Sequence, residues 1–204
     1  MASRSRLRIG VLTEDRTDAE TIEVLIRRIA AARGAAPGAI GLKARCGGGC
    51  AQLRSKARVW MDQLVELDEC SALVLVHDLD RDPQNGQLRD EPQLRRTLAE
   101  IPIPAAVPRH ICIPVEELEA WFLASERVLQ EICRKPTQAY ASPHTIPRPK
   151  EHLLELSKGA NRKPRHSTND NPRYAELLEL DACARRCPAF RELSEFVADL
   201  LAAA

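Results

Sequence analysis

The chain has 204 residues, a length that fits one medium-sized domain whose core needs no disulfide or metal to hold it together. Apolar residues make up 44% of the chain and charged residues 29%, and the formal net charge is +1. This ordinary globular composition excludes a global field that would attract nucleic acid or a membrane surface, so any such attraction must come from a local patch.

The N-terminus and the cysteines indicate where the protein resides. The stretch MASRSRLRIGVL is basic, and its apolar run is too short for a secretory signal or a membrane span, so we expect a cytoplasmic protein with no membrane partner. The seven cysteines are an odd number, which argues against a disulfide framework. Cys46/Cys50 and Cys183/Cys187 have CxxxC spacing, wider than the CxxC pairs usual in structural zinc sites, so we expect reduced and mostly buried thiols, with zinc binding as the alternative.

Short apolar runs alternate with amphipathic segments in the first part of the chain. Residues 7–12 are predicted to form a strand, and the capping box of residues 17–20 opens a helix that Gly34 ends. Residues 40–44 read as a weaker strand, and the glycines at 47–49 precede a second helix. The apolar face of that helix is predicted to hold Leu53, Ala57, Trp60, Leu64 and Leu67.

The same alternation continues to residue 124. The continuous apolar run 73–76 is typical of a strand covered on both faces, and the polar segment 78–90 follows it. Residues 94–99 are predicted to be helical and residues 109–113 to be a strand, after which Pro114 enters a helix in VEELEAWFLA. The order predicts an α/β fold: a mainly parallel sheet with helices on both faces.

The character of the chain changes after residue 133. Residues 134–150 contain no acid and four prolines, and a second basic stretch runs from residue 158 to residue 173. We therefore divide the chain into a core of residues 1–133 and a basic, proline-rich loop with a helical extension, residues 134–204, packed on that core. The two basic stretches could supply the local patch that nucleic acid needs, or they are solvated loops.

One glutamate in VEELEAWFLA falls in an unexpected place. At 100° per residue, Glu119 lies inside the apolar arc of a helix, between Val115 and Phe122. Glu116 and Glu117 fall outside the arc, and Glu116 is expected to be a solvated acid of the first turn. Because carboxylates are rarely buried without a partner, Glu119 needs one: a metal ion, or a salt bridge to an arginine.

Acidic residues follow three of the predicted strands. Glu14 follows the first, Asp78 and Asp80 follow the third, and Glu119 follows the fourth. Ligand sites of open parallel sheets lie outside the carboxyl ends of the strands, so these side chains are predicted to converge. Asp78 and Asp80 point the same way in an extended chain, and such oxygen donors suit Mg²⁺ or Mn²⁺. Helix capping is the alternative role for each acid.

The DxD of Asp78 and Asp80 is compatible with other chemistry. The chain contains no GxxxxGK[ST] sequence, so a P-loop ATPase is excluded. A phosphatase or sugar-nucleotide transferase stays open, although Asp82 and the position after the third strand depart from the dehalogenase-type motif. His77, just before the DxD, is expected to be a packed or hydrogen-bonded histidine rather than a ligand. The glycines at 47–49 form either a phosphate-binding loop or a plain tight turn.

These motifs resemble the TOPRIM fold of topoisomerases, bacterial primases and OLD-family nucleases. TEDRTD matches the pattern Glu, Gly, any residue, Thr, Glu, with Glu14 first and Asp15 in place of the glycine, and HDLDRD supplies the DxD. PVEELEAWFLA, PRPKEHL and CPAFREL are similar to segments of a small TOPRIM-like family of unknown function. The resemblance covers most of the chain and implies a TOPRIM-like, Rossmann-like core.

The resemblance also implies a function. Glu14, Asp78 and Asp80 would hold Mg²⁺ or Mn²⁺, Glu119 with Glu117 would hold or support a second ion, and Lys150 would contact a phosphate. The implied activity is metal-dependent phosphodiester hydrolysis, with DNA as the expected nucleic acid. Proteins of the resembling family often accompany an AAA or ABC-type ATPase, which suggests a prokaryotic anti-phage defence pair. A homo-oligomer is compatible with it, and a non-catalytic module that binds the ATPase is the alternative.

Overall fold

The computed structural model describes residues 7–82, 84–103, 107–160 and 162–203, so the basic residues 1–6 of the N-terminal stretch lie outside the described part. A four-stranded sheet with the order β2-β1-β3-β4 occupies the centre. All three neighbouring pairs are parallel, which confirms the predicted parallel α/β architecture. The strands are β1 (Leu7–Thr13), β2 (Ile40–Cys46), β3 (Ala72–Val76) and β4 (Arg109–Cys112).

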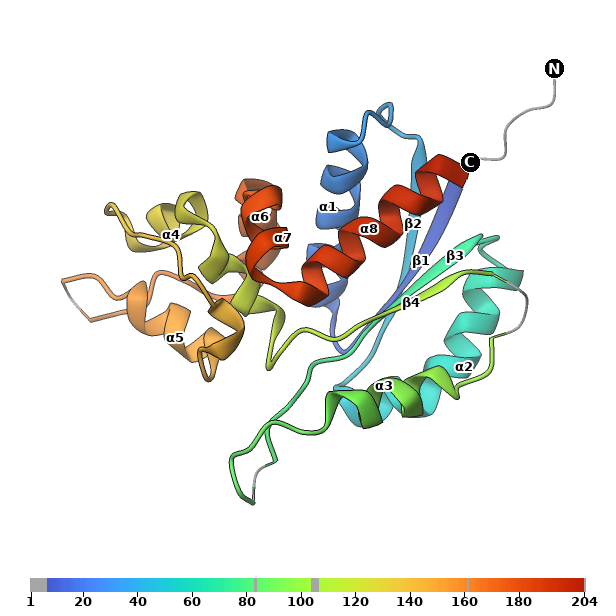
Figure 1. Ribbon diagram of the computed structural model, residues 1–204, viewed down its shortest axis with the longest axis horizontal. Helices are drawn as coiled ribbons and strands as arrows, with labels where there is room; N and C mark the ends of the chain where they lie inside the picture. The colour runs from blue at the N-terminus through green and yellow to red at the C-terminus, as the bar shows by residue number, and fades with distance from the viewer. Residues whose placement is uncertain (1–6, 83, 104–106, 161, 204) are drawn as a thin grey trace.

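Helices cover both faces of this sheet, as the alternation of elements predicts (Figure 1). Helices α1 (Arg16–Ala32) and α8 (Pro188–Ala203) lie on one face, and α2 (Cys50–Glu66) and α3 (Glu91–Ala99) lie on the other. Side chains of β3 alternate between the two cores, since Val74 packs on the α1 side and Leu75 on the α2 side. Both faces of β3 are buried, which explains its continuous apolar run.

The structure shifts the start of the first helix by one residue. Asp15 is the N-cap of α1, and its carboxylate accepts a hydrogen bond from the Asp18 backbone N–H at 2.9 Å. The helix therefore begins before the predicted capping box at 17–20. Asp15 has an extended backbone, with φ −140°, so this position does not require the glycine of the TOPRIM pattern.

The buried face of α2 differs from the prediction at its end. Leu53, Ala57 and Leu64 are buried as expected, but Leu67 is 74% exposed because the helix ends at Glu66. Met61 lies on the buried face instead. The helix begins after Gly49, whose φ of +93° is a conformation that side chains with a Cβ rarely adopt.

The predicted α-helix over residues 115–124 is wrong. Val115 extends the sheet by a parallel bridge to Leu79, and the Glu116 backbone N–H donates to the Leu79 carbonyl at 3.2 Å. These backbone groups bond to the neighbouring strand and are not available to a helix that starts at Pro114. A 3₁₀ helix, η1 (Leu118–Ala124), follows, and all seven of its residues are buried.

The C-terminal region packs on the sheet through helices of its own. They are α4 (Glu126–Cys133), η2 (Pro143–Thr145), α5 (Pro149–Leu156), η3 (Thr168–Asp170), α6 (Asn171–Leu177) and α7 (Leu180–Arg186). One hydrophobic cluster contains Ile22 of α1, Trp121 of η1, Tyr174 of α6 and Phe190 of α8. The proposed boundary between residues 133 and 134 falls at the end of α4, but this core runs across it.

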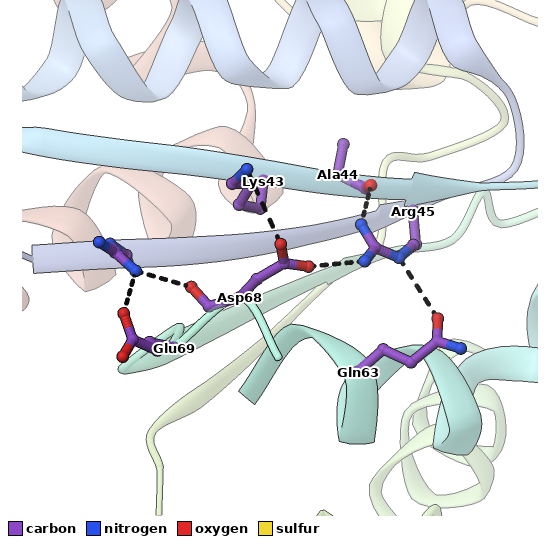
Figure 2. Close-up of polar contacts among 7 residues, drawn as sticks. Lys43, Ala44, Arg45, Gln63, Asp68 and Glu69 are labelled. Atoms are coloured by element: carbon purple, nitrogen blue, oxygen red, sulfur yellow. Dashed lines mark hydrogen bonds and ion pairs between the residues drawn. The ribbon is translucent and has the colours of Figure 1, made fainter. Parts of the chain in front are cut away.

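Strand β2 forms one edge of the sheet and contacts both α1 and α2. Charged side chains cover this edge. Figure 2 shows Asp68 between Lys43 and Arg45 of β2, with Oδ–N distances of 3.7 Å and 2.6 Å. Arg45 also donates to Gln63 of α2 at 3.4 Å. Cations on an edge strand oppose pairing with further strands, and here they also tie the edge to the end of α2.

Two further features concern the thiols and membranes. The seven cysteines are free, and five of them are buried: Cys70, Cys112, Cys133, Cys183 and Cys187. Within the described part of the chain, every helix is too short or too polar to span a bilayer.

Candidate metal centre

The carboxyl ends of the parallel strands surround a cavity of about 260 Å³. All six residues that the sequence singled out line it: Glu14, Asp78, Asp80, Glu117, Glu119 and Lys150. The lining also includes Asp15 and Asp18 from the start of α1. The cavity therefore gathers seven carboxyl groups against a single lysine, from segments that are far apart in the sequence.

Glu14 connects three elements around the cavity. It directly follows β1, and its side chain is 18% exposed. Its Oε1 accepts a hydrogen bond from the Asp78 backbone N–H at 3.2 Å, beyond the end of β3. The same oxygen accepts from the Cys50 thiol, at the start of α2, at 2.6 Å. The Glu14 carboxylate is thus fixed by its neighbours rather than free in solvent.

Asp78 and Asp80 both face the cavity, as their spacing in an extended chain predicts. Leu79, between them, points into the core and is 3% exposed. Burial raises the pKa of Asp78 well above its usual range, and the carboxylates of Asp18, Glu14 and Glu119 raise it further. Asp80 is more open, with 45% of its side chain exposed and Arg89 4.0 Å from its carboxylate.

Glu119 is buried, with 5% of its surface exposed, and its hydrogen-bond partner is an amide. The Asn171 side-chain NH₂ donates to Glu119 Oε1 at 2.9 Å, and no salt bridge to an arginine is found for Glu119 among the described residues. Burial raises the pKa of Glu119, although the bond from Asn171 opposes this shift. Glu117 accepts from the Lys150 backbone N–H at 3.0 Å, and burial together with Glu119 raises its pKa to about 7.

Asp18 is the site residue that sequence reasoning missed. It lies in the first turn of α1 and lines the cavity. Burial raises its pKa to about 8, with further contributions from Asp15, Glu119 and Glu14, while Lys150 lowers it. The sequence assigned Asp18 to a capping box. The available signal was the last position of the TOPRIM pattern, where an acid is expected and Asp18 stands.

A comparison with protein families places the whole cavity in one domain family. The family model described as Domain of unknown function (DUF4276) matches residues 13–198. The chain belongs to this family. The match spans the cavity residues from Glu14 to Thr168, so the site is part of the DUF4276 domain and not an appendage to it. No curated protein and no solved structure matches the chain.

His77 lies beside the acids of this DUF4276 domain but is not free to bind a metal. Ligand atoms of Glu14, Cys50 and His77 lie within 4.8 Å of one another. His77 Nε2 lies 3.1 Å from an Arg54 N–H, and arginine can only donate, so Nε2 accepts. The proton therefore resides on Nδ1, which donates to the Asp78 carbonyl at 2.8 Å. Both nitrogens are used, which confirms the expected hydrogen-bonded histidine.

The donor atoms around the cavity fit a hard divalent cation. Carboxylate oxygens dominate the lining, and Mg²⁺ and Mn²⁺ prefer oxygen ligands. Burial is the largest cause of the raised pKa values of Asp18, Asp78 and Glu117, and repulsion from neighbouring carboxylates raises them further. A divalent ion at this position would remove that repulsion.

The glycines at 47–49 form a tight turn beside the site. The Gly49 N–H donates to the carbonyls of Gly47 at 2.8 Å and Glu14 at 3.2 Å. The Gly48 N–H donates to the Gln52 side chain. These contacts occupy two of the loop N–H groups and attach the start of α2 to the end of β1, so they support the tight-turn interpretation.

A second, larger cavity of about 840 Å³ lies at the opposite end of the strands, where β1 and β2 begin. Its lining includes Arg8, Arg27, Arg28 and Lys43, together with apolar residues of α1 and β2. None of the six residues predicted from the sequence lines it. Size therefore does not distinguish the candidate site in this fold. The convergence of carboxyl groups at the strand ends does.

Proposed function

We propose that the protein is a Mg²⁺- or Mn²⁺-dependent nuclease that hydrolyses phosphodiester bonds. The observation that carries this proposal is the single cavity in which acids from three strand ends meet one lysine. The resemblance of the TEDRTD and DxD segments to TOPRIM enzymes supports the same class of reaction. A phosphate group is the substrate chemistry that needs both a cation-binding acid cluster and a fixed positive side chain.

Each residue has a role that follows from its position. Glu14, Asp78 and Asp80 would hold the first ion, and Glu117 with Glu119 would hold or orient a second. When bound, such ions supply an activated water and neutralise the charge on the leaving oxygen. Glu14, held by the Asp78 backbone and Cys50, keeps the two strand ends together. Lys150 provides the positive side chain that contacts the phosphate on the side away from the metal ions.

The expected substrate is DNA, and the protein is proposed to act in the cytoplasm. Arg148, which is exposed, and Lys150 lie at the start of α5 next to the cavity. They place two cations beside an otherwise acidic cavity. An AAA or ABC-type ATPase in a prokaryotic anti-phage defence system is the proposed partner, and a homo-oligomer is compatible with the site.

The test combines cation binding with cleavage. Calorimetry with Mg²⁺ and Mn²⁺ is expected to show saturable binding, and linear and supercoiled DNA are expected to be cut only when one of these ions is present. EDTA should stop the reaction. Saturable binding without cleavage of DNA or RNA, alone or with the ATPase, would favour a non-catalytic module. Turnover of small phosphate monoesters that survives Glu14→Gln would favour a phosphatase.

Substitution of Lys150 tests the phosphate contact. Lys150→Ala is expected to weaken DNA binding and to reduce the slope of log affinity against log salt by about one, because one phosphate contact is lost. Lys43→Ala is the matched control, since Lys43 lies on the edge strand β2 and lines the other cavity. Equal effects of the two substitutions would assign Lys150 to general electrostatics rather than to the site. Fluorescence anisotropy at several salt concentrations measures both.

A further inference from the structure

Glu116 is not the solvated acid that its place in the sequence predicts. Its surface is 6% exposed, and both carboxylate oxygens have partners. Arg81 approaches Oε1 with two nitrogens, Nε at 2.8 Å and Nη2 at 2.6 Å. The Arg148 backbone N–H donates to Oε2 at 2.7 Å. We call these contacts, from Arg81 and from Arg148, the Glu116 bridge.

The backbone on both sides of this bridge is in an unusual conformation. Glu116 has a φ of +61° and Arg148 a φ of +50°, both in the left-handed region that non-glycine residues rarely adopt. Such conformations persist when the surrounding contacts fix them, and they are frequent near functional sites. Here two of them are joined by one hydrogen bond, next to the acidic cavity.

The bridge connects the two sides of the cavity. Arg81 directly follows Asp80, so one end of the bridge holds the loop that carries the DxD. Arg148 is the N-cap residue of α5, and Lys150 lies in the first turn of that helix. The neighbouring Glu117 accepts the Lys150 backbone N–H at 3.0 Å. Consecutive glutamates therefore hold the start of α5 against the end of β4.

The charge of Lys150 acts across the cavity as a result. It lowers the pKa values of Asp18, Glu117 and Glu119, three of the acids that line the cavity. If the start of α5 moved away, the cavity would keep its acids and lose its only lysine. A contact that fixes the position of α5 would therefore determine where Lys150 meets a substrate phosphate. Such a contact would not touch the bound metal ions.

We propose that Glu116 is a positioning residue that sets Lys150 opposite the acids of the cavity by bridging the Asp80 loop to the N-terminus of α5. The role of Lys150 as a phosphate contact rests on the proposed function, whereas the placement of α5 by Glu116 does not. Glu116 itself touches neither substrate nor cation. The plain alternative is a buried ion pair that stabilises the fold and has no effect on the site.

The test uses a graded pair of variants and a matched control. Glu116→Asn tolerates the left-handed backbone but is too short to reach both partners, while Glu116→Gln keeps the length and loses the charge. Glu69→Asn is the control, because Glu69 is also left-handed, with φ +55°, and also pairs with an arginine, Arg8, away from the cavity. The full-length protein is used throughout.

Hydrogen exchange provides the readout that does not depend on activity. The amides of Arg148 and Lys150 are expected to exchange about tenfold faster in Glu116→Asn and by a smaller factor in Glu116→Gln, while the amides of β3 keep their rates. The Glu69→Asn control should leave Arg148 and Lys150 unchanged. Unchanged exchange of these two amides in both Glu116 variants would overturn the proposal. If the Asn variant does not fold, the Gln variant decides the result.

Activity then separates positioning from stability. Glu116→Asn is expected to raise the KM for DNA several-fold, to leave kcat and Mg²⁺ affinity nearly unchanged, and to have no added effect in a Lys150→Ala background. Additive losses, or an equal fall in Mg²⁺ affinity, would overturn the positioning role. If the wild-type protein neither binds nor cuts nucleic acid, the proposed function fails, and the exchange of Arg148 and Lys150 still decides whether Glu116 places α5.

Discussion

Replacement of Asp78 with Asn is expected to abolish metal-dependent cleavage and, at the same time, to stabilise the cation-free protein. Loss of a group that only supports metal ligands costs about 10–100-fold, so loss of a direct ligand should reduce the cleavage rate by at least about a hundredfold. Calorimetry should show Mg²⁺ binding weakened by a similar factor. The Asn side chain has nearly the same shape, so the fold should be kept.

The stabilisation follows from the position of the carboxyl group. Burial and four neighbouring carboxylates raise the pKa of Asp78 well above its usual range, so the folded protein is penalised whenever this group ionises. Asn carries no charge at any pH and avoids the penalty. In EDTA at pH 8, the Tm of the variant should exceed that of the wild type, with about 2–4 °C for each 1 kcal/mol gained.

The opposite directions of these two effects make the result specific. Asp199→Asn is the control, because Asp199 is exposed on α8 and should change neither activity nor Tm. A site in which Asp78 serves only as a structural hydrogen-bond acceptor would behave differently, since the Asn variant would lose stability and keep activity. That outcome would remove Asp78 from the candidate metal centre.

The sequence predicts the site well where strand ends determine it. Parallel strands have their carboxyl ends at the same end of the sheet. The alternation of strands and helices is therefore enough to predict that Glu14, Asp78 and Asp80 lie close together. Asp18 was harder to assign, because the first turn of a helix is a normal place for an acid that serves a cap. Its environment depends on burial and on Glu119, which only the tertiary structure brings near.

The prediction fails where backbone pairing overrides side-chain periodicity. VEELEAWFLA has helical spacing, but the Pro114 carbonyl and the Glu116 N–H bond to Leu79 and extend the sheet. This pairing turns Glu116 inward, toward Arg81 and Arg148, which follow other elements and are distant in sequence. Local pattern contains no information on such contacts, so the buried role of Glu116 could not be inferred from the sequence.

The acids of the cavity also predict how stability changes with pH. A carboxyl group whose pKa is raised by folding stabilises the protein while it is protonated, and this contribution is lost as pH rises through the folded pKa. Asp18, with a pKa of about 8, and Glu117, at about 7, titrate in the folded protein near neutral pH, whereas their unfolded forms ionise near pH 4. Stability in EDTA should therefore fall as the pH rises above about 4, and it should still be falling between pH 7 and pH 8.

Asp18 sets the expected size of this effect. A difference of one proton corresponds to about 1.4 kcal/mol per pH unit, so Asp18 alone lowers the free energy of unfolding by about 1 kcal/mol over this range. The Tm should fall by about 2–4 °C as a result. His110 has the opposite effect on stability, because burial lowers its pKa to about 4 and stability therefore rises with pH. This effect operates mainly below about pH 6.5, where the unfolded histidine takes up a proton.

Differential scanning calorimetry of the wild type and Asp18→Asn, with and without Mg²⁺, measures this dependence. The Tm of the variant should fall less than that of the wild type between pH 7 and pH 8, because the variant lacks the group with the pKa of about 8. Mg²⁺ should raise the wild-type Tm more at pH 8 than at pH 7, since cation binding requires ionised carboxylates and releases their protons. Equal pH dependence in the two proteins, or a Mg²⁺ effect that is the same at both pH values, would mean that Asp18 is not coupled to the cation. A coupled response would place Asp18 with Glu14 and Asp78 in one electrostatic unit, in which the negative charge that helps to raise the pKa values of Asp18 and Asp78 also attracts the ion.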